Sequence, residues 1–350
     1  MRLVDLFAAL CLGTVVLAES VREPVGDRVA RRAVPALAFA NGTGINAGKE
    51  YSLDTREDVP AAGKECTPSP LWAKKVDPAK YDMGCHEIEE LLQGSKTFAG
   101  RGNVREVYLA EYRGRSVALK LLIEESEHGR HQHLVELAAM DAVKGQPHVV
   151  DMLGFCGSTV VTEAYFKNAK RASLKLKEPL PMETVLSISL DAAQGLQSLH
   201  EAVDGPIVHF DIKASQLLID EDGGVKLADF NLSYFMGKNP DGSPCQFNKK
   251  EKHRDLSWRK SSEYVSGKPL TEKVDIYRMG VVYASIIAAG RGTVSPSKAG
   301  GAISLDPAWH EGYVKVVQEM LADEAKQRPS AGAIASRLEA MKQELLLHTR

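Results

Sequence analysis

Two short segments constrain the fold of this 350-residue chain more than any other feature. Residues 208–216 read Val-His-Phe-Asp-Ile-Lys-Ala-Ser-Gln and residues 227–231 read Leu-Ala-Asp-Phe-Asn, each beside an apolar run typical of a β-strand. Together they predict Asp211, Lys213 and Asp229 at strand ends. Phosphoryl transfer requires such a set: one carboxylate for the attacking hydroxyl, one for the metal on the phosphates, and a cation for the developing charge.

Two mainly apolar segments, 217–219 and 225–227, join these motifs. Residues 221–224, Glu-Asp-Gly-Gly, lie between them and predict a tight turn, so the pair is expected to form a β-hairpin. This hairpin would return Asp229 to the side of Asp211. We therefore expect both carboxylates in one site.

The spacing of these residues resembles the catalytic loop and the metal-binding tripeptide of protein kinases. The resemblance implies that Asp211 is the catalytic carboxylate, Lys213 the phosphate-facing lysine and Asp229 the principal metal ligand. Gln216 stands where the family has asparagine, and Asn231 stands where it has glycine. Both are expected near a second, looser metal site, with Asn231 in a left-handed backbone conformation. The cofactors implied are ATP and Mg²⁺ or Mn²⁺.

A glycine-containing segment upstream, 97–108, predicts a strand, a turn and a second strand. Glycines in such a turn let backbone amides approach phosphate oxygens. A lone Gly-x-Gly is more typical of a hairpin, but here Val107 and the strand 117–120 follow it in the family order. Arg105 occupies the third-glycine position, and two interpretations stay open: it caps the phosphates, or it lies in solvent.

Lys120 ends the strand 117–120, and Glu136 lies in a predicted helix over 131–144. The resemblance implies an ion pair between them that holds the lysine on the α- and β-phosphates. It also implies an adenine pocket closed by Thr162, with the backbone of 163–165 bonding the base. The nucleotide-binding residues expected are Gly100, Gly102, Val107, Ala118, Lys120, Glu136, Thr162, Glu163 and Tyr165.

Three later segments also resemble protein kinase motifs. Residues 258–264 are similar to the end of the activation segment, 273–282 to the central helix of the large lobe, and 322–338 to the closing helices. The resemblance implies a structural ion pair between Arg328 and Glu263.

The motifs follow one another in the family order, and a strongly amphipathic helix is predicted over 181–201. We therefore expect an α+β, two-lobed protein kinase-like fold over 81–346, with a small antiparallel β lobe and a larger helical lobe. Gln216 and the Asp-Phe-Asn tripeptide resemble a divergent secretory-pathway or protist branch of the superfamily.

The N-terminus predicts a signal peptide over 1–18, because an apolar run over 6–18 ends in small residues that suit cleavage before Glu19. The run is shorter than the roughly 20 residues that span a bilayer. We expect a chain that is secreted or retained in the ER or Golgi lumen, without a membrane span once the signal is removed; the alternative is a signal-anchored membrane protein. Residues 19–80 have scattered Pro and Gly and no apolar period, and predict a largely disordered linker.

Cysteine content and charge bear on compartment and partners. In an oxidising lumen the four cysteines after the signal would pair, and three connectivities are open; the alternative is that some are buried thiols. These cysteines are Cys66, Cys85, Cys156 and Cys245. The net charge of −2 argues against nucleic acid as a partner, because such binding relies on clustered cations.

Three functions are compatible with the sequence. The first is an ATP-dependent kinase acting on Ser or Thr hydroxyls of a protein, since Lys213 follows Asp211 by two residues. The second is a pseudokinase that serves as a binding or scaffold module, which Arg105, Gln216 and Asn231 favour. The third keeps the chemistry but transfers the phosphate to a glycan hydroxyl.

Phe210 replaces the arginine that in most kinases receives the activation-segment phosphate. A phenyl ring offers no hydrogen-bond donor to a phosphate. Activity is therefore expected not to depend on phosphorylation of Ser233, Ser243, Ser257 or Ser261.

Overall fold

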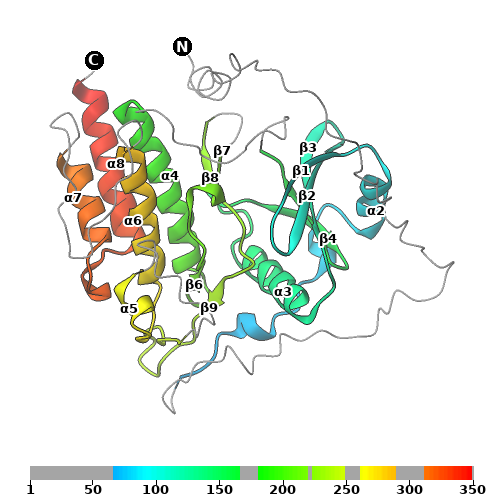
Figure 1. The fold of residues 1–350 in the computed structure, drawn as a ribbon, viewed down its shortest axis with the longest axis horizontal. Helices are drawn as coiled ribbons and strands as arrows, with labels where there is room; N and C mark the ends of the chain where they lie inside the picture. The colour runs from blue at the N-terminus through cyan, green and yellow to red at the C-terminus, as the bar shows by residue number, and fades with distance from the viewer. Residues whose placement is uncertain (1–65, 166–179, 220–222, 249–260, 289–310, 349–350) are drawn as a thin grey trace, which may run out of the picture. The chain divides into compact units, whose positions relative to one another are not determined.

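The computed structural model describes residues 66–165, 180–219, 223–248, 261–288 and 311–348 (Figure 1). All of them belong to one compact unit, Leu53–Arg350. The predicted signal peptide and residues 19–65 of the predicted linker lie outside this set. None of the helices in these ranges is long and apolar enough to cross a membrane.

The small lobe is built on a five-stranded antiparallel sheet, as expected. Its order is β1-β2-β3-β5-β4, and the two-residue turn between β2 and β3 uses Arg113 and Gly114 at φ 49° and 78°, the left-handed values that such hairpins require. The strands are β1 (Thr97–Arg101), β2 (Arg105–Tyr112), β3 (Arg115–Leu122), β4 (Met152–Cys156) and β5 (Thr159–Glu163).

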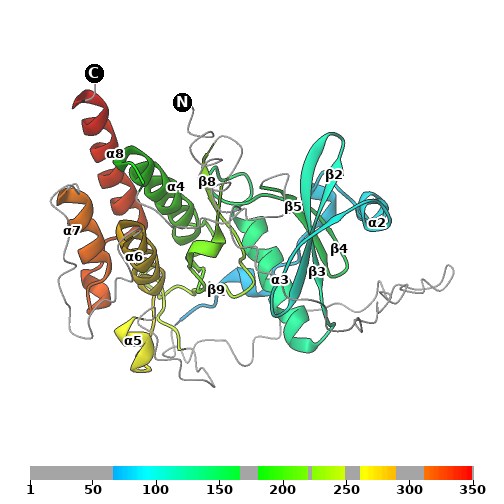
Figure 2. The same ribbon diagram turned by 45° about the horizontal axis from the view of Figure 1, so that its top comes forward.

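Alternation along β3 gives the sheet two different faces. Val117 and Leu119 are fully buried, and they pack with Ile88 of α2 (Cys85–Gln93). Ala118 and Lys120 therefore point to the opposite face, toward helix α3 (Glu127–Ala142) (Figure 2). This helix begins four residues before its predicted start, because the Ser126 side chain caps it by accepting from the Gly129 amide at 3.1 Å.

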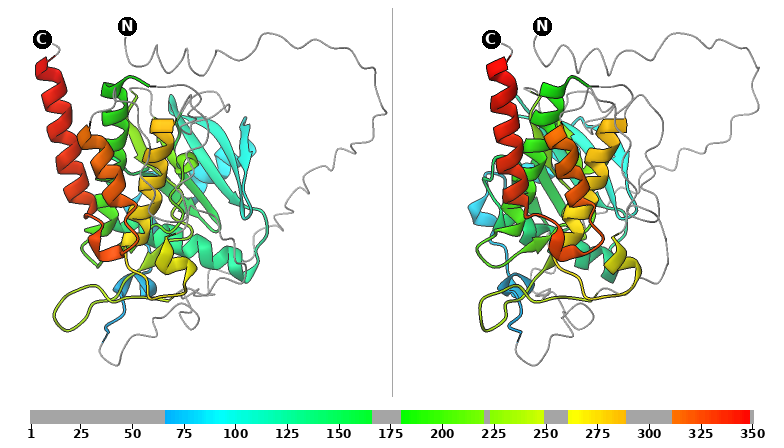
Figure 3. Two further views of the ribbon diagram at one scale, coloured as in Figure 1. Left: turned by 60° about the vertical axis from the view of Figure 1, so that its left-hand side comes forward. Right: turned by 90° about the vertical axis from the view of Figure 1, so that its left-hand side faces the viewer.

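The large lobe is helical and contains two small two-stranded sheets. The predicted hairpin is present as β7 (Leu217–Ile219) and β8 (Val225–Leu227), and β6 (Ile207–Val208) pairs with β9 (Tyr234–Phe235). The main helices lie side by side in Figure 3, where α4 packs on α8, α8 on α7 and α7 on α6. They are α4 (Met182–His200), α6 (Lys273–Ala288), α7 (Glu311–Met320) and α8 (Ala331–His348), with the short α5 (Ser262–Val265) below α6 in Figure 1.

The expected ion pair between Arg328 and Glu263 is present in the core of this lobe. Two nitrogens of the Arg328 guanidinium lie 2.6 and 2.9 Å from the two carboxylate oxygens of Glu263, and Arg328 is only 2% exposed. The same guanidinium donates to the carbonyls of Ala322 and Lys273. The pair thus joins α5 to the chain before α8.

The structure differs from the expected linker at residues 66–80. Two 3₁₀ turns occur there, η1 (Pro70–Ala73) and η2 (Pro78–Lys80), and Leu71 and Trp72 are buried. A disulfide joins Cys66 to Cys245. Composition misled the sequence-based expectation, because two buried apolar side chains and one covalent bond anchor a segment that is otherwise polar and rich in proline. The second disulfide, Cys85–Cys156, joins α2 to β4.

Candidate active site

Asp211 and Asp229 meet, although they follow different strands. The side-chain amide of Gln216 donates to the carboxylate of Asp211 at 3.1 Å and to that of Asp229 at 2.6 Å. The Lys213 ammonium donates to the same Asp211 oxygen at 2.5 Å. The β7–β8 hairpin produces this convergence, since it returns the chain to the end of β6. One amide therefore bridges the two carboxylates that the sequence motifs predicted to lie in one site.

The backbone conformation around Asp211 and Asp229 positions their two carboxylates. Phe210 and Asp229 adopt left-handed conformations, at φ 65° and 72°. The buried carboxylate of Asp275, on α6, accepts from the backbone amides of His209 and Phe210 at 2.6 and 2.9 Å. His209 itself contacts the carbonyl of Ala228 through Nε2 at 3.0 Å. Sequence reasoning had not assigned these roles to His209 and Asp275, and an aspartate near the start of the central helix was their only signal.

Asn231 departs from the expectation of a left-handed residue beside the metal. Among the described residues, the non-glycine positions with positive φ are Arg113, Phe210 and Asp229. The Asn231 side-chain amide instead donates to Oε1 of Gln132 on α3 at 3.4 Å. Asparagine here connects the tripeptide to α3, a contact that glycine could not make.

Lys120 and Glu136 form the expected ion pair between β3 and α3. The carboxylate of Glu136 is fully buried, whereas the Lys120 ammonium reaches the cleft and lies 3.8 Å from an oxygen of Asp229. Val107 lies directly opposite Lys120 in the sheet register, so both side chains are on the cleft-facing side of the sheet. The pair therefore places a cation beside the second of the two carboxylates.

The observed position of Arg105 contradicts the interpretation that this side chain lies in solvent. It is only 6% exposed, and its guanidinium lies 2.9 Å from Glu136 and 2.8 Å from Nδ1 of His133. It also donates to the backbone carbonyls of Lys120 and Ser158, at 3.2 and 3.1 Å. The guanidinium is thus held by groups of the protein, because α3 presents a buried carboxylate to the start of β2, and Arg105 is also part of the cleft wall.

These contacts determine the charge states of Glu136 and His133. Burial by itself raises the pKa of Glu136, but the adjacent Lys120 and Arg105 cations outweigh it and lower that pKa to about 2. Burial, followed by the Arg105 charge, lowers the pKa of His133 from 6.5 to about 4. Glu136 is therefore ionised and His133 neutral at physiological pH, so Nδ1 of His133 is able to accept from Arg105.

One cleft of about 890 Å³ contains the whole expected site. Its wall includes every expected catalytic, metal and nucleotide-binding residue, namely Gly100, Gly102, Val107, Ala118, Lys120, Glu136, Thr162, Glu163, Tyr165, Asp211, Lys213, Gln216, Asp229 and Asn231. Additional lining comes from α3, through His128 and Gln132.

The segment expected to bond an adenine base is partly engaged by the protein. The backbone amide of Glu163 donates to Asp151 and that of Ala164 donates to Ser116, at 3.2 and 3.3 Å. The Glu163 carboxylate accepts from the Lys226 ammonium at 2.9 Å and from the Tyr165 hydroxyl at 2.5 Å. The backbone amides of 163 and 164 therefore already donate to carbonyls within the protein, whereas the sequence led us to expect them to donate to the base.

A family model described as protein tyrosine and serine/threonine kinase matches residues 94–338 of this sequence. The chain belongs to the protein kinase family. Its two-lobed α+β fold agrees with the fold that the sequence motifs predicted.

Several plant kinases are similar to the chain. A probable receptor-like protein kinase of Arabidopsis thaliana is 29% identical, over 69% of this chain and 38% of the relative. The chitin elicitor receptor kinase 1 of the same plant is 30% identical, over 72% of this chain and 39% of its own length. A probable serine/threonine-protein kinase, also from Arabidopsis, is 32% identical over 61% of this chain and 53% of its length. The chain thus spans about a quarter to a half of the length of the curated relatives it matches.

The kinase cleft suits a magnesium nucleotide in its donor chemistry. In the part of the chain that the structure describes, no three His, Cys, Asp or Glu side chains converge to hold a metal by themselves. Mg²⁺ is usually held by one or two carboxylates together with substrate phosphates, so Asp229 with a nucleotide meets that requirement. Gln216 now directs its NH₂ group at both carboxylates, and its amide would have to turn to offer oxygen to a cation.

Proposed function

We propose that this kinase transfers the γ-phosphoryl group of ATP to a serine or threonine hydroxyl of a protein. The observation that carries the proposal is the convergence of Asp211, Lys213 and Asp229 with the Lys120–Glu136 pair in one cleft. ATP supplies the phosphoryl group, and a bound Mg²⁺ or Mn²⁺ neutralises phosphate charge.

Each side chain has a distinct task in this proposal. Asp211 orients the attacking hydroxyl and accepts its proton, while Lys213, 2.5 Å from that carboxylate, supplies positive charge where it develops. Asp229 would hold the metal, together with Gln216 once its amide has turned to present its oxygen. Lys120 contacts the phosphates, and buried Glu136 keeps its ammonium in the cleft. The Ser/Thr acceptor is supported by the position of Lys213 and by relatives named as serine/threonine kinases.

A pseudokinase is the second candidate, and one contact favours it. The Gln216 amide bridges Asp211 and Asp229, and donors held on both carboxylates compete with a metal and with a substrate hydroxyl. A glycan hydroxyl as acceptor is chemically compatible with the same cleft, but no contact among the described residues favours it.

Replacing Gln216 with asparagine separates these candidates. The shorter side chain withdraws the amide by about 1.5 Å, which relaxes the bridge and restores the residue type of the family. We expect turnover equal to or above wild type, and ATP affinity within about threefold. The assay is phosphate transfer from radiolabelled ATP with Mg²⁺ or Mn²⁺, beside ATP binding with and without metal. Gln197→Asn, the same change on α4, is the control.

Phosphate transfer by the wild-type chain supports the proposed kinase function. The pseudokinase is established if neither wild type nor Gln216→Asn transfers phosphate and ATP binds equally well with and without divalent metal.

We also propose that the kinase acts in the secretory pathway. Two disulfides support this location, because such bonds persist in oxidising compartments and are rare in the cytosol. The expected N-terminus of the secreted chain is Glu19. N-terminal sequencing of protein from culture medium checks it, and a chain with Met1 intact in the membrane pellet would contradict it.

A further inference from the structure

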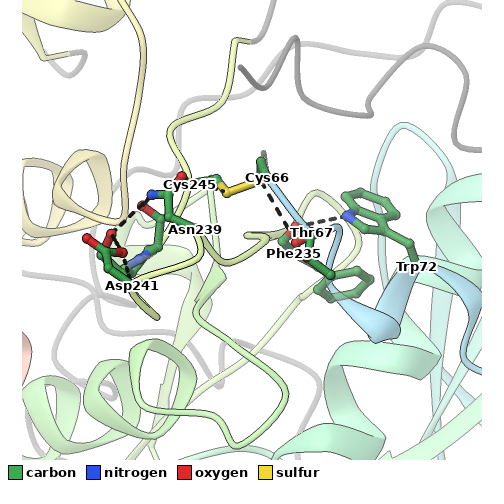
Figure 4. The surroundings of a disulfide bond; sticks show 9 residues. Cys66, Thr67, Trp72, Phe235, Asn239, Asp241 and Cys245 are labelled. Carbon is green, nitrogen blue, oxygen red and sulfur yellow. Dashed lines mark hydrogen bonds between the residues drawn. A yellow bond between two sulfur atoms is a disulfide. The ribbon is translucent and has the colours of Figure 1, made fainter. Parts of the chain in front are cut away.

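Residues 66–83, called the strap below, are bound to residues 234–247, called the clamped segment. The Cys66–Cys245 disulfide joins them covalently (Figure 4). Beside it, Thr67 and Lys238 exchange two backbone hydrogen bonds of 2.9 Å each. A Cβ added to Gly237 would lie 2.4 Å from the Thr67 carbonyl oxygen, so the close approach requires glycine at that position. The contact is thus specified by covalent bond, backbone pairing and side-chain size.

Trp72 provides a second attachment farther along the strap. Its indole is buried, and Nε1 donates to the carbonyl of Phe235 at 2.8 Å (Figure 4). The ring also packs edge-on against Tyr234 and Phe235, with centroids 5.2 and 4.8 Å apart. Because aromatic pairs of this geometry add to the free energy gained by burial alone, Trp72 anchors β9 strongly.

The other end of the strap holds α3 and the small lobe. Asp141, near the end of α3, accepts from the Tyr81 hydroxyl at 2.6 Å and lies 2.8 Å from the Lys74 ammonium. The Lys144 ammonium, just beyond α3, lies over the Tyr81 ring, 4.2 Å from its centroid. The Met83 amide donates to the Leu153 carbonyl of β4 at 3.1 Å. One continuous segment therefore contacts α3, the sheet and the clamped segment.

The two elements held in this way carry or adjoin the groups of the proposed active site. Helix α3 bears Glu136, the partner of Lys120. The clamped segment begins five residues after Asp229, and its β9 pairs with β6, the strand that leads to Asp211. In protein kinases, control of activity acts on these two elements through the position of the helix and phosphorylation of the activation segment.

The arginine that usually binds the activation-segment phosphate is replaced by Phe210 in this chain. Phe210 is buried and lies edge-on to Phe247 and Tyr264, at 6.1 and 5.5 Å between centroids. Arg278 stacks over the Phe210 ring at 4.9 Å and donates to the Phe210 carbonyl. An aromatic cluster thus fills the place where other kinases bind the phosphate.

We propose that the strap is a built-in positioning element, which holds α3 and the clamped segment in the catalytic arrangement in place of activation-segment phosphorylation. The proposal rests on the proposed kinase function. Trp72 and the Cys66–Cys245 bond act through β9 and α3, so they are positioning groups that do not touch substrate.

The test compares the full secreted chain with variants that cut the strap at different points. Cys66→Ser with Cys245→Ser removes the covalent link, and Trp72→Ala removes the ring, whereas Trp72→Phe keeps most of its packing. Cys85→Ser with Cys156→Ser removes the other disulfide and is the matched control. The measurements are hydrogen exchange of the backbone amides of 234–247 and of α3, binding of ATP, kcat and KM for ATP, and kcat after phosphatase treatment.

We expect Cys66→Ser/Cys245→Ser and Trp72→Ala to raise exchange at least about tenfold in both elements and to lower kcat by about tenfold or more, with a smaller change in KM. Trp72→Phe should recover most of the loss seen in Trp72→Ala. The control should leave exchange of 234–247 and kcat within twofold of wild type, and phosphatase should leave wild-type kcat unchanged.

Exchange does not require turnover, so it separates this proposal from the proposed function. If the wild-type chain transfers no phosphate, the proposed kinase function fails. The hydrogen-exchange measurement still tests the proposal about the strap. The proposal is overturned if the folded strap variants show the same hydrogen exchange as wild type, or if the control raises exchange of 234–247 equally. It is also overturned if phosphatase treatment abolishes wild-type activity. If the double cysteine variant does not fold, the comparison of Trp72→Ala with Trp72→Phe decides.

Discussion

Replacing Asp211 with asparagine is expected to lower kcat by about 10²–10⁴-fold, the range of a positioned general base. Asparagine preserves the shape of the side chain but cannot take up the proton of the attacking hydroxyl. It also weakens the contacts that Lys213 and Gln216 make with the carboxylate, which are 2.5 and 3.1 Å long. ATP affinity should stay within a few-fold, since Lys120, Glu136 and Asp229 are unchanged. Steady-state kinetics and ATP titration give the two quantities separately.

Asp323→Asn is the control for this variant, because Asp323 is an exposed aspartate outside the cleft lining. It should leave both kcat and ATP affinity unchanged. An Asp211→Asn enzyme that retains more than a tenth of wild-type kcat would show that another group accepts the proton.

Replacing Arg328 with alanine is expected to lower the free energy of unfolding by about 3–5 kcal/mol, the usual cost of removing one partner of a buried ion pair. Glu263 would then keep a buried charge without its cation. The variant also loses the donors to the carbonyls of Ala322 and Lys273. Denaturant titration of the purified chain measures this change.

A surface pair provides the matched control. Arg337 and Glu319 lie 2.5 Å apart, but each side chain is about a third exposed. Arg337→Ala should therefore cost less than about 1 kcal/mol. Equal losses for Arg328→Ala and Arg337→Ala would contradict the structural importance of the buried pair.

The loss of unfolding free energy in Arg328→Ala should depend on pH, because it depends on the ionisation of Glu263. Burial by itself raises the pKa of this carboxyl, but the hydrogen bonds and charge of Arg328 outweigh it and lower the pKa. A carboxyl with a lowered folded-state pKa stabilises the protein above its unfolded-state pKa, and that contribution is lost as pH falls through the folded-state pKa. The difference between wild type and Arg328→Ala should therefore shrink in acid. A difference that grows toward low pH would contradict this charge assignment.

Local spacing in the sequence was enough to predict much of the fold and the meeting of Asp211 with Asp229 in one cleft. The hairpin between Asp211 and Asp229 is short, and its two apolar strands and glycine turn permit one close return of the chain. The Lys120–Glu136 pair was also predictable, because family order fixed which strand and which helix carry the two charges. In these cases, neighbouring residues or a fixed succession of elements determine which groups meet.

Tertiary structure alone decided the contacts between segments far apart in the chain. Arg105 is buried because α3 brings Glu136 and His133 against the start of β2, a packing that its own neighbours do not encode. Likewise, four cysteines permit three pairings, and choosing Cys66–Cys245 and Cys85–Cys156 requires the folded positions of segments 179 and 71 residues apart. The strap was missed for the same reason: its polar composition resembles a linker, and its order comes from Trp72 and Cys66 binding a surface that exists only after the large lobe has folded.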